Sequence, residues 1–202
     1  FELSWDTLRA DLYSEKFDFI PNVMYLTIPR IPEFDFTEPF AYMSMGIGVV
    51  RADDDRFEDF QDLNDPSVRV SLVQGWTPTD LAREMLPNAN LLIKPMDNPA
   101  SFQFQELASG RADVILQDAA TASLIKKSHP EKVKLLWVEN PPMRYACSFM
   151  LREGDDELNR FLSEAINAML VDGTIKRLDQ KWNGFADIRE LRFTPGSGLP
   201  AN

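Results

Sequence analysis

Three residues of this 202-residue chain could together recognise a molecule that carries both a carboxylate and an ammonium group. Arg30 could hold a carboxylate with two parallel hydrogen bonds, which a lysine does less well. Thr77 opens a predicted helix, and the free N–H groups of a helix start attract anions. Asp118, after the apolar run 112–116, could accept an ammonium group. A cleft that removes a zwitterion from water must give each charge a partner, because an unpaired buried charge costs several kcal/mol.

Each of these residues also has an ordinary structural interpretation. Arg30 could form a surface ion pair, and Asp118 could cap the helix that follows it. Around Thr77 the sequence is typical of a well-capped helix. Gly75 allows a tight turn, Thr77 suits the N-cap position, and Asp80 completes a capping box. Local sequence leaves both interpretations open at all three positions.

The composition argues against several other kinds of chemistry. One cysteine, Cys147, and one histidine, His129, cannot build a zinc site without several carboxylates. No Cys–His or Ser–His pair suggests nucleophilic catalysis. We therefore expect no metal and no cofactor. The net charge of −11 argues against a nucleic-acid partner. No apolar run approaches the roughly 18 residues of a membrane-spanning helix.

Strand-like and helix-like segments alternate along the chain, which is typical of an α/β protein. The predicted strands are 17–24, 47–51, 68–73, 91–94, 112–116, 133–138 and 145–151. The predicted helices are 5–14, 80–85, 102–109, 119–127, 157–171 and 174–181. In open α/β sheets, ligands bind beyond the carboxyl ends of the strands. This rule selects the loop that contains Arg30, the turn 74–80, and the strand end at Gln117 and Asp118.

Two segments repeat one pattern. Residues 12–20 (LYSEKFDFI) and 107–115 (LASGRADVI) both run from a helix through a polar turn into a strand, with Ser, a basic residue and Asp in the same places. Such a repeat suggests two lobes of similar topology, although helices commonly feed strands in this way. The chain opens inside a strand-like segment at Phe1, so we expect that an N-terminal piece precedes it.

Several segments of the chain resemble the motifs of a known family. The segments 27–30 (TIPR) and 34–40 (FDFTEPF) are similar to the T-x-x-R … F-T-x-P-Y signature of family-3 extracellular solute-binding proteins, the receptors of polar-amino-acid ABC importers. Three further segments fall in the family's order and spacing: 74–77, 110–118 and 172–182. The resemblance covers nearly all of residues 1–184, and its combination of motifs is specific although no single motif is.

The resemblance implies a two-lobed α/β fold of the periplasmic-binding-protein type (type II) with two hinge strands. Residues 1–46 and 151–202 would form lobe 1, residues 52–143 lobe 2, and residues 47–51 and 144–150 the hinge. The family normally begins with a strand, a helix and a further strand that come before Phe1. The first lobe would therefore be incomplete at its N-terminus, and much of the side-chain pocket would be absent.

The resemblance also implies roles for individual residues. Arg30 matches the residue that binds the α-carboxylate, Thr77 the second carboxylate contact, and Asp118 the acceptor of the α-ammonium group. Five further residues would line or flank the pocket: Trp5, Tyr25, Gly75, Trp76 and Gln117. Tyr25 departs from the family pattern, because many members have Ser or Thr there. A phenol at this position could narrow the site or exclude an ordinary amino acid.

These expectations together describe a binding protein that is not an enzyme. It would bind an amino acid or related small carboxylate and deliver it, as a periplasmic or extracellular monomer, to the permease of an ABC importer. Two alternatives remain open. The chain could be an enzyme on the same scaffold, similar to cyclohexadienyl dehydratases. Those enzymes carry a carboxylate three residues after the aspartate that matches Asp118, where this chain has Thr121. It could also be the sensor domain of a membrane receptor, which a transmembrane segment beyond Asn202 would favour.

Overall fold

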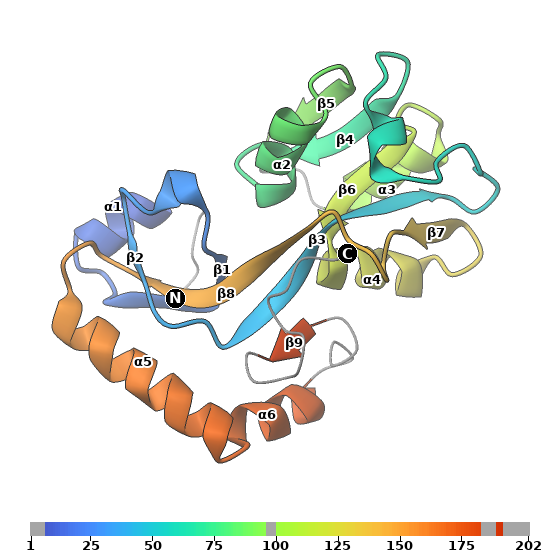
Figure 1. Cartoon of the computed structure of the whole chain (residues 1–202). Helices are drawn as coiled ribbons and strands as arrows, with labels where there is room; N and C mark the ends of the chain where they lie inside the picture. The colour runs from blue at the N-terminus through green and yellow to red at the C-terminus, as the bar shows by residue number, and fades with distance from the viewer. Residues whose placement is uncertain (1–6, 96–99, 183–188, 192–202) are drawn as a thin grey trace. The chain divides into compact units, whose positions relative to one another are not determined.

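The computed structural model describes residues 7–95, 100–182 and 189–191, and Figure 1 labels their helices and strands. These residues form two compact units. Unit 1 contains the described residues of Phe1–Met43 and Tyr145–Leu199, and unit 2 contains Ser44–Arg144 without its gap. The chain passes from one unit to the other within two long strands, β3 (Ala41–Arg51) and β8 (Met143–Leu151).

Unit 1 is built around an antiparallel pair, β1 (Phe19–Tyr25) and β8. Strand β2 (Asp35–Phe36) also pairs with β8, and β9 (Arg189–Leu191) pairs with β3. The helices of the unit are α1 (Leu8–Tyr13), the 3-10 turn η1 (Ile28–Arg30), α5 (Asp156–Val171) and α6 (Thr174–Trp182). Its buried core joins α1 to β1 and β8 and consists of Leu8, Leu12, Ile20, Met24, Phe34 and Met150.

Unit 2 contains the parallel strands of the protein. Strand β4 (Arg69–Val73) pairs in parallel with β5 (Asn90–Lys94) and β6 (Val114–Asp118), and β3 pairs antiparallel with β6 and β7 (Val133–Leu136). The helices are α2 (Thr77–Met85), α3 (Ala100–Ala108), α4 (Ala119–Ser128) and the 3-10 turn η2 (Phe60–Leu63). Helices α2 and α3 both contact β4 and β6. These two strands are almost wholly buried, as expected for parallel strands covered on both faces.

The α/β class predicted from the sequence is confirmed. The largest difference in an element is at β3, which begins at Ala41 and not at Ile47. The segment 41–45 (AYMSM) alternates buried and half-buried residues, and β9 pairs with its first three residues. Among the described residues, every helix is too short or too polar to cross a lipid bilayer.

The two repeated segments are similar in their hydrogen bonds as well as in their sequence, because each accepts two bonds from one arginine. Arg152 Nη1 donates to the carbonyl oxygens of Leu12 and Phe17, at 3.2 and 3.4 Å, which are the first and sixth residues of the first repeat. Arg51 Nη1 donates to the corresponding two carbonyl oxygens of the second repeat, both at 3.2 Å. Each arginine also lies 3.3 Å from the carboxylate three residues further along the chain. A helix–turn–strand motif bridged by one arginine thus occurs once in each unit.

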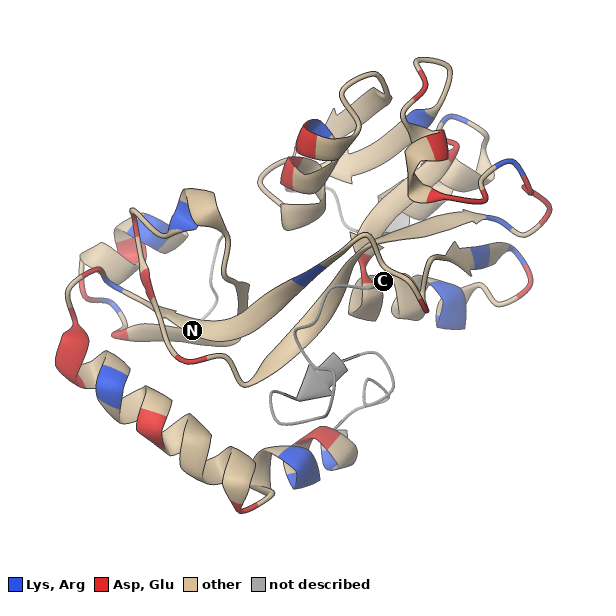
Figure 2. Ribbon diagram, in the orientation of Figure 1, with Lys and Arg blue, Asp and Glu red and all other residues tan. Residues whose placement is uncertain are grey.

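In unit 2 the arginine-bridged motif is part of a larger, buried ionic network. Asp54 and Asp113 are 7% and 3% exposed. Arg56 Nη2 joins them, at 2.7 Å from Asp54 Oδ2 and 2.9 Å from Asp113 Oδ1. Arg69 donates to Asp113 from its backbone N–H, Nε and Nη2, at 3.0, 2.9 and 3.1 Å, and Arg51 lies at the edge of the network. Elsewhere acidic and basic residues are interspersed along the elements of each unit (Figure 2).

Acid is expected to destabilise unit 2 through Asp113. Burial alone would raise the pKa of this carboxyl, but hydrogen bonds from Arg69 and Arg56 outweigh burial and lower the pKa from the usual 3.8 to about 2. A carboxyl with a depressed pKa stabilises the folded state above its unfolded value, and this contribution is lost as the pH falls from about 4 to about 2. The loss should be about 2 kcal/mol.

Urea unfolding at pH 5 and at pH 2.5 measures this loss. Asp113→Asn cannot titrate, so the variant should lose less stability than the wild type between these two pH values. An equal loss in both proteins would contradict the assignment to Asp113.

Candidate ligand-binding site

Arg30 lies in the single 3-10 turn that follows β1 in unit 1. Thr27 is extended, Pro29 lies in the first turn of η1, and Arg30 N donates to Thr27 O at 3.0 Å. The side chain is half-buried, and its Nη1 donates to the carbonyl oxygen of Tyr25 at 3.1 Å. This contact holds the guanidinium near the carboxyl end of β1. A guanidinium has five N–H donors in a fixed fork, so a carboxylate could be bound there with two bonds.

Tyr25 is the last residue of β1 and lies next to a second tyrosine. Its ring centroid is 6.3 Å from that of Tyr145 on β8, with the ring planes tilted by 46°. Both side chains are half-buried. No local pattern selects Tyr145, because this residue comes close to Tyr25 through the pairing of β1 with β8. Trp5, the other residue predicted for this half of the site, lies outside the described residues.

Helix α2 begins directly after β4 in unit 2. Gly75 has φ of +78°, a left-handed conformation that glycine adopts readily, and it turns the chain between the strand and the helix. Trp76 is the N-cap and is half-buried, and Thr77 is the first helical residue and 3% exposed. The prediction that Thr77 is the N-cap is therefore wrong by one residue. Within the described residues, the Trp76 side chain makes no capping hydrogen bond.

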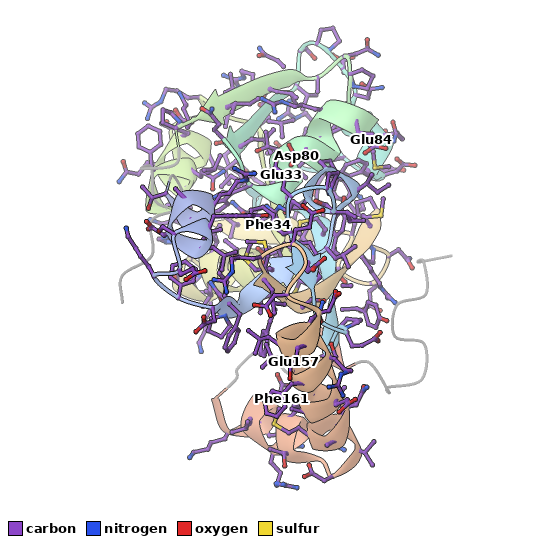
Figure 3. All side chains as sticks on the ribbon, turned by 90° about the vertical axis from the view of Figure 1, so that its left-hand side faces the viewer. Glu33, Phe34, Asp80, Glu84, Glu157 and Phe161 are labelled. Carbon is purple, nitrogen blue, oxygen red and sulfur yellow. The ribbon has the colours of Figure 1, made fainter. Side chains whose placement is uncertain are left out.

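A threonine that the sequence did not single out fixes this turn. The Thr79 hydroxyl, which is fully buried, donates to the carbonyl oxygen of Val73 at 2.5 Å. This bond ties the first turn of α2 to the end of β4. Asp80 and Glu84 lie one turn apart on the exposed side of the same helix, where they play no part in a cap (Figure 3).

Asp118 is both the last residue of β6 and the N-cap of α4. Its Oδ1 accepts from Thr121 N at 2.9 Å and its Oδ2 accepts from the Thr121 hydroxyl at 3.0 Å. The capping interpretation is thus observed. The two capping bonds leave acceptor positions of the carboxylate available, because a carboxylate has about four. Within the described part of the chain, Asp118 is half-buried and has no ion-pair partner, so its negative charge is not neutralised by a neighbouring cation.

Gln117 is held inside unit 2. Its Nε2 donates to Gln103 Oε1 at 2.7 Å, and Gln103 Nε2 donates to the carbonyl oxygen of Ser71 at 3.2 Å. A carbonyl oxygen can only accept, so this chain of bonds fixes the orientation of both amides. Gln117 Oε1 is buried without a hydrogen-bond partner among the described residues. Gln103 is on α3, and its contribution could not be found without knowing that α3 covers β4 and β6.

The structure brings the groups of unit 2 to one edge of its sheet. Strands β4 and β6 are parallel neighbours, so their carboxyl ends lie at the same edge. Thr77 follows the end of β4 and Asp118 ends β6. Arg30 and Tyr25 belong to unit 1. In the described part of the chain, no three His, Cys, Asp or Glu side chains are grouped so that they could hold a metal ion.

Comparison with known protein families gives a match to the bacterial extracellular solute-binding proteins, family 3, over residues 1–185. The chain belongs to this family. The family resemblance of the sequence motifs is therefore confirmed, and this solute-binding protein is a member of a family of extracellular proteins.

Curated relatives of this solute-binding protein include transport receptors and one enzyme. It is 26% identical over 185 residues to a probable amino-acid ABC transporter-binding protein of Haemophilus influenzae, covering 91% of this chain and 68% of the relative. It is 27% identical to the L-cystine-binding protein TcyJ of Escherichia coli K12, covering 91% and 66%. It is 24% identical to the cyclohexadienyl dehydratase of Pseudomonas aeruginosa, covering 89% and 65%. The chain thus spans about two thirds of the length of these relatives.

Solved structures similar to this solute-binding protein include amino-acid-binding proteins. One is an ancestral amino acid-binding protein described as a precursor of cyclohexadienyl dehydratase, with a TM-score of 0.76 and 30% identity over 90% of this chain and 75% of that one. Another is an ancestral arginine-binding protein bound to arginine, with a TM-score of 0.76 and 28% identity over 91% and 79%. These neighbours have a two-lobed fold, which confirms the predicted fold class.

Proposed function

We propose that this protein binds an amino acid, or a closely related small carboxylate, and delivers it to the permease of an ABC importer from outside the cytoplasm. Arg30 and the start of α2 at Thr77 would bind the α-carboxylate, and Asp118 would accept the α-ammonium group. Amino-acid ABC transporter-binding proteins among the relatives support the solute class and the transporter. The protein would act as a monomer.

The observation that carries this proposal is the arrangement at the sheet edge of unit 2. An anion-binding helix start and a carboxylate lie at the ends of neighbouring parallel strands, where ligands bind in α/β folds. Asp118 is half-buried and has no ion-pair partner among the described residues. A ligand ammonium group would supply that partner, and the ligand carboxylate would reach Thr77 and Arg30.

We further propose that the protein has two lobes whose bounds are close to those of the two compact units, between which the chain passes at Met43–Ser44 and Arg144–Tyr145. Residues 1–46 and 151–202 would form lobe 1 and residues 52–143 lobe 2, with 47–51 and 144–150 as hinge strands. A bound ligand would stabilise the closed form only through contacts that differ between the open and closed states.

We do not favour catalysis, although one relative is a dehydratase. A dehydratase needs a general acid in its site. The dehydratase resemblance implies a carboxylate at the position of Thr121, whose hydroxyl instead donates to Asp118. Among the residues of the candidate site, Asp118 is the sole carboxylate, and both of its oxygens accept capping hydrogen bonds from Thr121.

A thermal-shift screen of the full-length protein tests the proposal. The panel contains the twenty amino acids, L-cystine and small carboxylates without an amino group. One or more amino acids should raise the melting temperature by about 5 °C or more at a concentration near 100 times Kd. Carboxylates without an amino group should have little effect, because they leave Asp118 without a partner.

The same protein is then incubated with prephenate and with arogenate, and aromatic products are measured. Formation of aromatic product with turnover would overturn the transport proposal in favour of the dehydratase. A panel in which no amino acid stabilises the protein would count equally against the proposal.

A further inference from the structure

Strand β3 contains an irregularity directly opposite the candidate ligand groups of unit 2. Met45 pairs with Asp118 and Ile47 pairs with Gln117, so β3 advances two residues while β6 advances one. Gly46 is the extra residue of this bulge, and its φ is +82°. A glycine in the left-handed conformation is typical of such bulges, which redirect the side chains of the strand and its partner.

The space that a side chain of residue 46 would need is already occupied by neighbouring atoms. A Cβ atom added to it would lie 2.4 Å from Pro142 Cγ, 3.1 Å from Leu81 Cδ2 and 3.3 Å from Pro142 Cδ. Real Cβ atoms essentially never approach another heavy atom to less than 3.0 Å. The backbone conformation and the close packing therefore both require glycine at this position.

The neighbours of Gly46 are the elements that carry the ligand groups. Leu81 is 1% exposed and belongs to α2, whose first residue is Thr77. Asp118 is opposite the bulge on β6. Pro142 directly precedes β8. One residue without a side chain thus touches the body of the anion-binding helix and sets the register of the strand that ends in Asp118.

We propose that Gly46 is a positioning residue of the binding site: its bulge sets the place of the Asp118 carboxylate relative to the start of α2. The inference rests on the proposed function for the roles of Asp118 and Thr77. It goes beyond that function because Gly46 itself carries no group that could bind a ligand. Its effect is transmitted through the β3–β6 pairing and through Leu81.

Gly46→Ala is the variant that tests this inference, and the chain offers two matched controls in the same unit. Gly110 has φ of +72° and nothing within 4 Å of an added Cβ, so Gly110→Ala imposes backbone strain without overlap. Gly48 lacks a left-handed φ, and its added Cβ would lie 2.7 Å from Trp137 Cζ3, so Gly48→Ala imposes overlap without strain. Gly48 pairs with Leu116, one step further from the end of β6.

Two readouts separate a positioning role from a merely structural one. The first is hydrogen exchange of the Thr121 amide, which donates to Asp118 Oδ1 and so reports the carboxylate without any ligand. The second is the Kd for L-arginine, L-cystine and L-glutamate, measured at a temperature where each variant is fully folded. Gly46→Ala should speed Thr121 exchange and weaken binding of whichever probe binds the wild type, each by about tenfold or more. The two controls should lower the melting temperature and leave both readouts within about twofold of the wild type.

Adding Pro142→Ala to Gly46→Ala removes the closest overlap and should restore part of the binding, which also provides a second variant if Gly46→Ala does not fold. Equal changes of Thr121 exchange in Gly46→Ala and Gly48→Ala would overturn the inference. Failure of all three amino acids to bind the wild type, with Thr121 exchange still specific to Gly46→Ala, would instead count against the proposed function and leave the positioning role in place.

Discussion

Arg30→Ala and Asp118→Ala are each expected to weaken binding of the best amino acid by about 100-fold or more, without unfolding the protein. Each charged group of the ligand leaves water on binding and needs a partner of opposite charge, and each substitution removes one such partner. Truncating one member of such a pair costs about 2–5 kcal/mol. Arg30 Nη1 donates to Tyr25 O, and Asp118 caps α4 through Thr121. Both residues are only half-buried, so each variant is expected to fold. Isothermal titration at 25 °C measures the change.

Two control variants separate this loss from general effects. Arg160→Ala removes an arginine of α5 that is 69% exposed and 3.5 Å from Glu164. Asp59→Ala removes another N-cap aspartate of unit 2, which accepts from Gln61 N. Both controls should keep wild-type affinity. If Arg30→Ala and Asp118→Ala also keep it, neither residue contacts the ligand and the proposed site is wrong.

Asp113→Asn is expected to destabilise unit 2 by about 3 kcal/mol, because breaking a buried ion pair leaves its partners uncompensated. Asp113 accepts four hydrogen bonds from Arg69 and Arg56. An asparagine keeps the shape, but it loses the charge and turns an N–H₂ group toward guanidinium donors. The effect falls at the low end of the range for buried pairs because the Arg56 and Arg69 side chains are 51% and 38% exposed. Urea unfolding of the wild type and the variant at pH 7 gives the difference.

The repeat supplies the matched control for this prediction. Asp18 occupies the position of Asp113 in the first repeat, but it is 73% exposed and lies 3.8 Å from Arg152. An exposed pair of this kind contributes little, so Asp18→Asn should change the free energy of unfolding by less than about 0.5 kcal/mol. Equal effects of the two substitutions would show that the buried network does not stabilise unit 2.

The alternation of apolar runs and helical patterns was enough to predict the fold class and nearly all of the longer elements. This worked because β4 and β6 are buried on both faces and read as continuous apolar runs. The repeat was also visible, since Ser, a basic residue and Asp recur at fixed positions. The sequence did not show that the aspartate of the second repeat is buried whereas that of the first is exposed. Asp113 is buried because Arg56 and Arg69 converge on it, and these contacts join residues about 45–60 positions apart.

The candidate site was predicted in outline but not in its supporting contacts. Arg30 follows β1 and Asp118 ends β6, so the strand-end rule finds both from sequence. Gln103 and Tyr145 act through neighbours on other elements, and no local pattern identifies them. Gly46 and Gly48 did offer a signal, because glycines inside a strand indicate a bulge or a close backbone approach. The contacts of Gly46 with Leu81 and Pro142 required the tertiary structure.

The proposed site requires one ligand to bring a carboxylate to Arg30 and an ammonium group to Asp118. The direct measurement is titration of the wild type, Arg30→Ala and Asp118→Ala with three compounds: the best amino acid, its α-amide, and its analogue without the α-amino group. The wild type should bind the amino acid at least about 30-fold more tightly than either analogue. Discrimination against the amide should disappear in Arg30→Ala alone, and discrimination against the deaminated analogue in Asp118→Ala alone. Discrimination that persists unchanged in both variants would show that Arg30 and Asp118 do not contact the charged groups of the ligand.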